Sequence, residues 1–321
     1  MQIFCTNIKR YDLPFLENGL PGVLNSGAFS TVPLDKENAS TISKETCTLV
    51  VSHLCTVDEP VLSQFPNLKQ VVTRSTGINH VDFEYCREKN IAVQNIVDYS
   101  TESVAEYSVA LLLTLIRNIH LQINSKNSRT LIPKSGFELR GKNVGIVGFG
   151  RIGENIAQLL AGFGVNIFFF NPSFKEAGVL RTQRLENLNE LLGMCDVLFL
   201  CCPLNSQTKH LINQKNISIL KPNAVLINTS RGEVVETKAL IKALKENRIG
   251  GVALDVLEEE SAVLSDVCHD LWSQFLNDQR VIFTPHNAFL SEESLQRLWG
   301  KVLDILVVSS AQEQKFAGET L

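Results

Sequence analysis

VGIVGFGRIGENIAQLL, residues 144–160, is the most informative stretch of the chain for its architecture. It carries the spacing G-x-G-x-x-G at Gly148, Gly150 and Gly153, with an apolar run before it and a helical pattern after it. In this context the first glycine permits a tight turn, the second lets the backbone approach a pyrophosphate, and the third lets helix and strand pack closely. A glycine-rich turn without a ligand is the alternative. The flanking strand and helix favour a phosphate site, because the start of a helix offers N–H groups and a positive dipole end.

Strand-like and helix-like segments alternate on both sides of this motif, which predicts an α/β fold. Several of the strands are apolar without alternation, as expected for parallel strands that are covered on both faces. The predicted strands are 48–54, 69–75, 143–149, 165–171, 196–202, 224–230, 250–256 and 281–286. One predicted helix begins near Thr101. The others cover 152–163, 185–194, 237–247 and 292–308.

The glycine motif begins almost halfway along the 321 residues, and the segment before it contains strands of its own. We therefore predict two Rossmann-like, doubly wound parallel-sheet domains, with a nucleotide domain (99–289) inserted into a substrate domain (1–98 and 290–321). Two domains around a cleft imply hinge closure, with hinges expected near 98–99 and 288–290. The helix after Thr101 has a long apolar face, which could pack on its own core or on a second subunit.

Composition excludes several classes of protein. The chain has 30 Lys and Arg against 34 Asp and Glu, a net charge of −4, whereas a general nucleic-acid binder is normally basic. No apolar run is long enough for a membrane span, and the first residues do not resemble a signal peptide. The eight cysteines form no CxxC pair or zinc-ribbon spacing, so we expect reduced thiols and no metal site. The sequence predicts a cytoplasmic protein.

Three further segments place polar residues where predicted strands end. They are NTSRG with Arg231, ALDVLEEE with Glu260, and TPHNAF with His286. Taken singly, Arg231 could bind surface carboxylates, Glu260 could be a solvated acid, and His286 could be structural. Together they form a plausible catalytic set, because the carboxyl ends of parallel strands line the ligand crevice of an open sheet.

The order of these motifs resembles the D-isomer-specific 2-hydroxyacid dehydrogenase family. The resemblance runs from GFGRIG through NTSRG, then ALDV with an acid five residues on, to TPHNAF, and it covers about residues 50–308. NAFLSEESL, residues 287–295, and the long acidic stretch after Asp255 are most similar to the D-lactate dehydrogenase branch.

The resemblance implies three catalytic residues. Arg231 would bind the substrate carboxylate and polarise the keto oxygen. His286 would be the general acid in reduction and the general base in oxidation. Glu260 would pair with His286 and favour its charged form, because a nearby opposite charge raises the pKa of a histidine.

The resemblance also implies the binding residues. RSTGINHVD, residues 74–82, matches the family loop whose backbone amides accept the substrate carboxylate. The substrate contacts would then be Thr76, Gly77, Tyr99, Arg231 and Phe289, with Phe289 as an apolar wall. Asp255 would hold the nicotinamide end of the cofactor. The cofactor contacts would be Gly148, Gly150, Arg151, Ile152, Gly153, Asn171, Cys202, Pro203, Thr229 and Asp255.

Asn171 departs from the usual cofactor pattern. NAD sites commonly place Asp or Glu at the end of the second strand, where it binds the adenosine ribose. Asn can still hydrogen-bond the ribose, but it does not repel a 2′-phosphate. Ser173, Lys175 and Arg181 lie nearby in the sequence and could accept such a phosphate or could be ordinary surface residues. We expect NAD as cofactor, with NADP left open.

These observations predict an NAD-dependent D-2-hydroxyacid dehydrogenase that reduces pyruvate to D-lactate. A reductase of the same family for glyoxylate, hydroxypyruvate or a bulkier 2-ketoacid is the first alternative. A non-catalytic NAD(H) sensor similar to a corepressor is the second, and the intact Arg–Glu–His set disfavours it. The family resemblance implies a homodimer.

Overall fold

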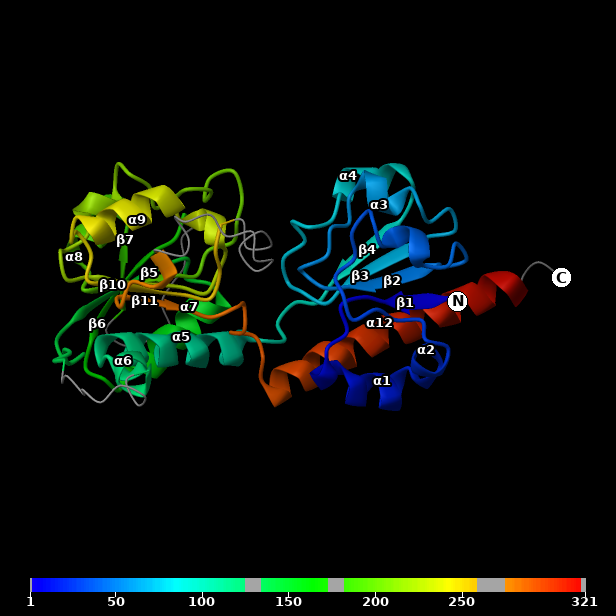
Figure 1. The fold of residues 1–321 in the computed structure, drawn as a ribbon, viewed down its shortest axis with the longest axis horizontal. Helices are drawn as coiled ribbons and strands as arrows, with labels where there is room; N and C mark the ends of the chain where they lie inside the picture. The colour runs from blue at the N-terminus through cyan, green and yellow to red at the C-terminus, as the bar shows by residue number, and fades with distance from the viewer. Residues whose placement is uncertain (1, 125–133, 173–181, 259–274, 319–321) are drawn as a thin grey trace. The chain divides into compact units, whose positions relative to one another are not determined.

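The computed structural model describes residues 2–124, 134–172, 182–258 and 275–318. The chain forms two compact units (Figure 1). Unit 1 comprises Met1–Ser100 together with Leu290–Leu321, and unit 2 comprises Thr101–Phe289. The chain therefore builds most of unit 1, completes unit 2, and returns to unit 1 with its last segment.

Unit 1 contains a four-stranded parallel sheet. Its strands lie in the order β1 (Ile3–Cys5), β2 (Thr48–Val51), β3 (Gln70–Thr73) and β4 (Ala92–Asn95). The sequence patterns predict β2 and β3, whose residues are fully buried. They miss the two edge strands, because β1 has three residues and β4 alternates between exposed and half-buried positions.

Helices cover both faces of this sheet. In Figure 1, α3 and α4 lie on one face and α1, α2 and α12 lie on the other. The prediction ended the last helix at residue 308, whereas α12 continues to Gly318. The bounds are α1 (Leu13–Gly19), α2 (Pro21–Asn25), α3 (Glu59–Leu62), α4 (Phe83–Glu88) and α12 (Glu292–Gly318).

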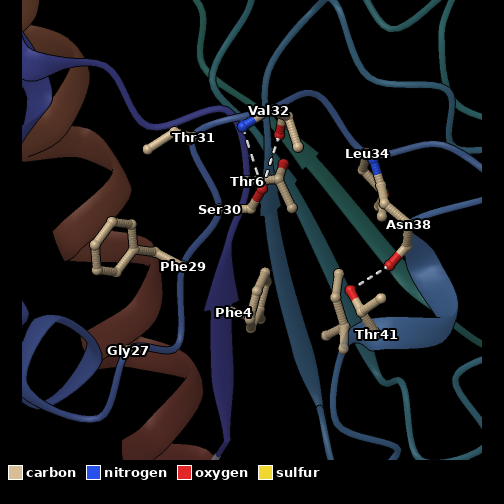
Figure 2. Close-up of a pocket in the computed structure, with 11 residues that line it drawn as sticks. Phe4, Thr6, Gly27, Phe29, Ser30, Thr31, Val32, Leu34, Asn38 and Thr41 are labelled. Atoms are coloured by element: carbon tan, nitrogen blue, oxygen red, sulfur yellow. Dashed lines mark hydrogen bonds between the residues drawn. The ribbon is translucent and has the colours of Figure 1, made fainter.

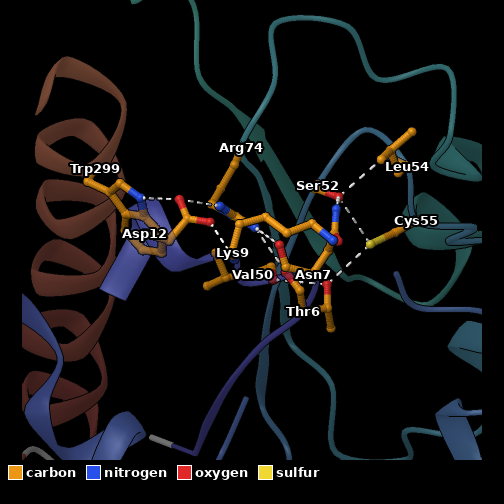
Figure 3. A network of polar contacts seen from close by, with 10 residues as sticks. All are labelled: Thr6, Asn7, Lys9, Asp12, Val50, Ser52, Leu54, Cys55, Arg74 and Trp299. Carbon is orange, nitrogen blue, oxygen red and sulfur yellow. Dashed lines mark hydrogen bonds and ion pairs between the residues drawn. The ribbon is translucent and has the colours of Figure 1, made fainter. Parts of the chain in front are cut away.

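A buried polar network joins the two ends of the chain within unit 1 (Figure 3). Arg74 Nη1 donates to Asp12 Oδ1 at 3.1 Å, and the indole Nε1 of Trp299 donates to the same oxygen at 2.8 Å. The Arg74 guanidinium also lies 5.1 Å from the Trp299 ring centroid. All three side chains are almost fully buried, so their charges and donors depend on one another.

Unit 2 contains a seven-stranded parallel sheet. Its order is β11-β10-β9-β8-β5-β6-β7, so the strand order reverses at β5. This is the Rossmann arrangement, in which ligands bind beyond the carboxyl ends of the strands at the point of reversal. The strands are β5 (Asn143–Val147), β6 (Asn166–Phe170), β7 (Thr182–Leu185), β8 (Val197–Leu200), β9 (Val225–Asn228), β10 (Gly251–Leu254) and β11 (Val281–Phe283).

The helices of unit 2 bury the two faces of the sheet. Figure 1 shows α8 and α9 on one face and α5 and α7 on the other. The apolar residues of α5 share a hydrophobic core with α7 and the seven-stranded sheet, which favours packing of α5 within its own unit. Leu185 ends β7, so the predicted helix 185–194 is wrong at its start. The bounds are α5 (Thr101–Ile116), α6 (Ile119–Asn124), α7 (Arg151–Ala161), α8 (Leu188–Met194) and α9 (Thr237–Lys245).

Within the described residues, no helix combines the length and the apolar character needed to cross a bilayer. The seven cysteines in this part of the chain form no disulfide. Burial raises the pKa of the Cys195 thiol to about 12, so this side chain is a neutral, small hydrophobe at neutral pH.

Candidate active site

The glycine loop lies where β5 meets α7, at the reversal of strand order. Gly148 has φ +89°, and a Cβ placed there would lie 2.7 Å from the backbone nitrogen of Cys202. A Cβ at Gly153 would lie 2.4 Å from the carbonyl oxygen of Gly148. The turn and the close packing of helix on strand therefore require glycine at both positions.

The remaining parts of the loop fit a dinucleotide pyrophosphate. A Cβ at Gly150 would meet nothing within 4 Å, so the backbone there is open to an approaching group. Glu154 N donates to Gly150 O at 3.0 Å, and the N–H groups of residues 151–153 precede this first intrahelical bond. The loop thus presents open backbone and the start of α7, which includes Arg151 and Ile152, as an anion cradle.

The ends of β8 and β9 supply the next predicted cofactor residues. Cys202 and Pro203 follow β8, and the Cys202 backbone opposes Gly148. Burial raises the pKa of the Cys202 thiol to about 11, so it carries no charge at neutral pH. Thr229 follows β9, and its hydroxyl lies 2.8 Å from the Ser108 hydroxyl of α5. These positions lie at the sheet edge where the Rossmann arrangement places ligands.

Asn171 follows β6 and faces the glycine loop. Its Oδ1 accepts a hydrogen bond from Phe149 N at 3.3 Å, and its backbone oxygen accepts one from Arg184 Nη2 at 3.2 Å. Sequence reasoning missed Arg184, because it stands on β7, a strand that was not predicted. The other predicted phosphate partners, Ser173, Lys175 and Arg181, lie outside the described residues.

Arg231 lies in a turn that its neighbours shape. The buried Asn228 accepts hydrogen bonds from the backbone and hydroxyl of Ser230, and its Nδ2 donates to Arg231 O at 2.9 Å. A Cβ at Gly232 would lie 2.0 Å from the backbone carbon of Leu257. Only glycine lets this turn pack against the segment after β10, and the Arg231 Nη1 donates to Ser230 O at 2.6 Å.

His286 occupies a backbone conformation that a side chain rarely adopts. Its φ is +55°, and its N–H lies 2.9 Å from both Asp255 O and Thr284 O. Its ring meets the Phe289 ring edge to face, with the centroids 6.4 Å apart. Such strained positions cluster at functional sites when the surroundings hold them in place.

Asp255 provides most of that support. Its Oδ1 accepts hydrogen bonds from Thr284 Oγ1 at 2.6 Å and Asn287 N at 2.9 Å, and its Oδ2 accepts one from Ala288 N at 2.8 Å. Burial raises its pKa above the usual range, although these hydrogen bonds and nearby His286 oppose the shift. The Asp255 side chain is 1% exposed, so the structure assigns it the support of the His286 turn. Its contact with nicotinamide stays a prediction.

Two supporting residues were missed by sequence reasoning. Ser103 Oγ of α5 donates to Ala288 O at 2.8 Å and so connects this helix to the His286 turn. Asn228 organises the Arg231 turn as described above. An Asn followed by Thr and Ser is a signal for a side-chain-bonded turn, which could have found Asn228. Ser103 carries no such signal.

The strand register brings these turns to one edge of the sheet. Leu254 is paired with Asn228 on one side and with Phe283 on the other. Arg231 stands three residues after Asn228, and His286 stands three residues after Phe283. The arginine and the histidine therefore follow strands on either side of β10, beyond the same carboxyl edge.

The acidic segment after β10 is described only as far as Glu258. Glu260 lies outside the described residues. Glu258 Oε1 lies 2.6 Å from His210 Nε2, and its Oε2 accepts a hydrogen bond from Thr237 N at 3.1 Å. Burial pushes the pKa of Glu258 upward, but these hydrogen bonds outweigh it and hold the pKa below its usual value. Glu258 is thus a paired acid.

The predicted substrate residues of unit 1 are Thr76, Gly77 and Tyr99. Ser75 Oγ donates to Gly77 O at 2.7 Å, and Thr76 Oγ1 donates to Ile96 O at 3.1 Å, so local bonds hold this loop. Tyr99 is 6% exposed, and its carbonyl accepts a hydrogen bond from Arg297. Substrate contact by these residues stays a prediction.

Unit 1 also has a pocket of about 440 Å³ between β1 and the segments near residues 30 and 40 (Figure 2). Phe4 and Phe29 lie on one side of it. Its polar groups are already bonded locally, for example Asn38 Nδ2 to Pro33 O and Thr41 Oγ1 to Asn38 O. None of the lining residues is a predicted site residue, so this pocket is separate from the chemistry above.

The fold and the glycine loop define a dinucleotide-binding α/β protein with an arginine and a histidine at its ligand-binding edge. A sequence model of the D-isomer specific 2-hydroxyacid dehydrogenase NAD binding domain matches residues 109–288. The chain belongs to this family and is an oxidoreductase that binds NAD.

Similar proteins support the same family. D-lactate dehydrogenase kk1H of Curvularia clavata is 34% identical over 93% of this chain and 89% of its own length. Glyoxylate reductase of Pyrococcus furiosus is 35% identical over 72% of this chain and 69% of its own length. The crystal structure of D-lactate dehydrogenase from Aquifex aeolicus, complexed with NAD and lactic acid, has a TM-score of 0.83 at 28% identity. That match covers 98% of this chain and 97% of the other.

Proposed function

We propose that this protein is an NAD-dependent D-lactate dehydrogenase that reduces pyruvate to D-lactate. The observation that carries the proposal is the placement of Arg231 and His286 beyond the same sheet edge as the glycine loop. The similarity to D-lactate dehydrogenases over almost the whole chain supports the choice of substrate.

The residue types suit reduction of a small anionic ketone. NADH, when bound, supplies the hydride that adds to the keto carbon. Arg231 binds the carboxylate and stabilises the negative charge that builds on the keto oxygen. His286 gives its proton to that oxygen, and in the reverse direction it removes the hydroxyl proton.

The support beneath His286 belongs to the same mechanism. Asp255 fixes the turn of residues 284–288 through its three hydrogen bonds, and Ser103 holds it from α5. A general acid works efficiently only when its ring is held at the reacting oxygen. We propose that Glu260 pairs with His286 and favours its protonated form, that Phe289 bounds the methyl group of the substrate, and that Thr76, Gly77 and Tyr99 contribute to substrate binding.

A second candidate is a reductase for glyoxylate or another 2-ketoacid. The similarity to the glyoxylate reductase of Pyrococcus furiosus, at nearly the same identity, favours keeping this candidate. The same residues would perform the same chemistry, and only the space around Phe289 would differ. One methylene group in such a pocket typically changes the transition-state energy by about 1–3 kcal/mol.

The test compares kcat/KM for pyruvate, glyoxylate, hydroxypyruvate and 2-ketoisocaproate with NADH. We expect pyruvate to be the best substrate. Replacement of the general acid in His286→Ala should lower kcat by about 10²–10⁴-fold, and Arg231→Gln should raise KM and lower kcat. Preference for another acid would move the assignment to the second candidate, and normal turnover by His286→Ala would refute the mechanism.

We also propose a homodimer, as the family resemblance implies, and a cytoplasmic location, as the sequence predicts. Sedimentation equilibrium of the purified protein tests the first, and a monomer at micromolar concentration would contradict it. Fractionation of cells that express the natural protein tests the second.

A further inference from the structure

A row of side-chain hydrogen bonds joins the end of β3 to the predicted substrate loop of unit 1. Thr73, the last residue of β3, has its Oγ1 2.8 Å from Ser75 Oγ and 2.9 Å from His80 Nε2. Ser75 Oγ in turn donates to Gly77 O at 2.7 Å. The row thus connects a histidine ring to the backbone of the loop that the proposed function assigns to the substrate.

Only one direction satisfies the hydrogens of this row. Each hydroxyl has a single hydrogen to donate, and a carbonyl oxygen can only accept. The Ser75 hydrogen goes to Gly77 O, so Ser75 Oγ accepts a hydrogen bond from Thr73 Oγ1. The Thr73 hydrogen is then used, so its oxygen accepts a hydrogen bond from His80 Nε2. The arrangement therefore requires a hydrogen on His80 Nε2.

Hydrogen bonds hold three successive carbonyl groups of the loop. Ser75 O accepts a hydrogen bond from Ile96 N at 3.2 Å. Thr76 O accepts one from Asn95 Nδ2 at 2.6 Å. Gly77 O completes the series, and its bond comes from the row that begins at the histidine.

The same bonds orient the N–H groups of the loop. A peptide unit is planar and trans, so its N–H points opposite to its C=O. The bond to Gly77 O therefore fixes the N–H of Ile78, and the bond to Thr76 O fixes the N–H of Gly77. No described residue accepts a hydrogen bond from the N–H groups of residues 76–78. Successive N–H groups of this kind form concave sites for anions such as a carboxylate.

His80 is a fixed starting point for the row. Its carbonyl oxygen accepts a hydrogen bond from Val57 N at 2.9 Å, and Val57 O accepts one from Asp82 N at 2.9 Å. The histidine is half-buried, and its backbone is thus tied to a second segment of unit 1. A ring held in this way can transmit its position through the two hydroxyls.

We propose that His80 is a positioning residue that acts on the substrate through the loop. By way of the two hydroxyls it fixes Gly77 O, and the peptide plane then directs the N–H of Ile78 toward the carboxylate of the 2-ketoacid. The inference rests on the proposed function, because it takes that carboxylate as the ligand of the loop. It adds His80, Thr73 and Ser75 to the residues that determine substrate affinity.

The first test removes the middle hydroxyl of the row. Thr73→Val replaces it with a methyl group, whereas Thr73→Ser keeps it. We expect Thr73→Val to raise KM for pyruvate about tenfold and to change kcat less than about twofold, because it weakens binding of substrate and transition state alike. Thr73→Ser should stay within about twofold of the wild type in both constants. Affinity for NADH, measured by fluorescence titration, should be the same in all three proteins.

Thr48→Val is the matched control. Thr48 is a buried threonine at the start of β2, and its Oγ1 donates to Gln70 Oε1 at 3.3 Å, at the opposite end of the same sheet. Both valine variants should melt at a lower temperature, because each loses a buried hydrogen bond. Only Thr73→Val should raise KM. An equal rise in the control would overturn the proposal, since it would follow from lost stability alone.

A second pair of variants keeps the proposal testable if Thr73→Val does not fold. His80→Gln keeps a side-chain N–H donor of similar reach, and His80→Leu has no donor. We expect His80→Leu to raise KM for pyruvate about tenfold and His80→Gln to stay within about threefold of the wild type. A wild-type KM in His80→Leu would overturn the proposal, and so would equal rises in both variants.

A proton–nitrogen correlation spectrum of the imidazole groups tests the direction of the row without turnover. The signals of His80 are identified by their loss in His80→Gln, and we expect a hydrogen on Nε2. An Nε2 without a hydrogen would overturn the inference even if pyruvate is reduced. A protein that reduces no 2-ketoacid would instead refute the proposed function, so the two failures are distinguishable.

Discussion

Asp255 shows how one buried side chain can hold the turn that carries His286, the proposed general acid. It accepts three hydrogen bonds from the turn that carries His286, and it lies almost completely out of solvent. Asp255→Asn supplies one acceptor oxygen where two are used and turns an NH₂ group toward backbone donors. We expect a loss of about 1–3 kcal/mol in the free energy of unfolding, which is typical of an unpaired buried donor. We also expect kcat to fall at least about tenfold, because His286 loses its fixed position.

The matched control for this variant is Asp278→Asn. Asp278 pairs with Arg280 at 2.6 Å, and its side chain is partly exposed. Urea denaturation measures the stability of both variants. Steady-state kinetics should show a lower kcat for the Asp255 variant alone. Equal kcat values for both variants and the wild type would show that Asp255 does not position His286.

The pair of Glu258 and His210 gives a prediction about pH. The folded pKa of Glu258 lies below its ordinary value of 4.5, because the hydrogen bonds from His210 and Thr237 outweigh its burial. An acid with a lowered folded pKa adds stability above its ordinary pKa and loses it as the pH falls through the folded value. His210 has φ +51°, so His210→Asn removes the partner with a residue that tolerates this backbone.

We expect the wild type to be more stable than His210→Asn at about pH 5. The difference in unfolding free energy should shrink as the pH falls to about 3, where Glu258 becomes protonated in both proteins. Chemical denaturation at several pH values measures it. A difference that stays constant over this range would contradict the stabilising role of the pair.

The glycine loop between β5 and α7 contains one glycine that packing requires and another that leaves the backbone open to a ligand. A Cβ at Gly153 would meet Gly148 O at 2.4 Å, whereas a Cβ at Gly150 would meet no atom within 4 Å. Gly153→Ala should therefore destabilise the protein by about 1–3 kcal/mol, as overpacking does. Gly150→Ala should keep its stability but place a methyl group where the pyrophosphate would lie, and so weaken NADH binding about tenfold or more.

Thermal melting and NADH titration followed by fluorescence together check these two variants. Gly150→Ala that binds NADH like the wild type would contradict the position of the pyrophosphate. Gly153→Ala with unchanged melting would contradict the close packing of α7 on β5.

The elements that the sequence predicted are those with strong local patterns. Buried apolar runs identified β5, β6 and β8–β11, and helical periodicity identified α5, α7 and α9. The patterns missed β7, the strand TQRL, because it is polar and half-exposed at the sheet edge. This omission also concealed Arg184. Residues that act through long-range contacts, such as Ser103 with Ala288, leave no mark in a local pattern.

Unit 1 contains both the first and the last segments of the chain, and these segments stabilise one another. Asp12 lies near the start, Arg74 at the end of β3, and Trp299 on α12, yet they meet in one buried network (Figure 3). Removal of one partner from a buried ion pair leaves the other charge uncompensated. Arg74→Met should therefore lower the free energy of unfolding by about 3–5 kcal/mol.

The double variant Asp12→Asn/Arg74→Met should recover part of this loss, because it removes both charges. Arg10→Met, at an exposed position, is the control and should change stability by less than about 0.5 kcal/mol. Denaturation followed by circular dichroism compares the wild type, Arg74→Met, Asp12→Asn, the double variant and the control. A double variant that is as unstable as the sum of the single losses would contradict the coupling.

The configuration of the lactate that the protein forms tests the proposed function of the whole molecule most directly. Purified protein is incubated with NADH and pyruvate, and the lactate formed is separated by chiral chromatography. We predict D-lactate alone, formed in equal amount to the NADH oxidised. L-lactate, a racemic mixture, or no oxidation of NADH with any 2-ketoacid would contradict the proposed reaction.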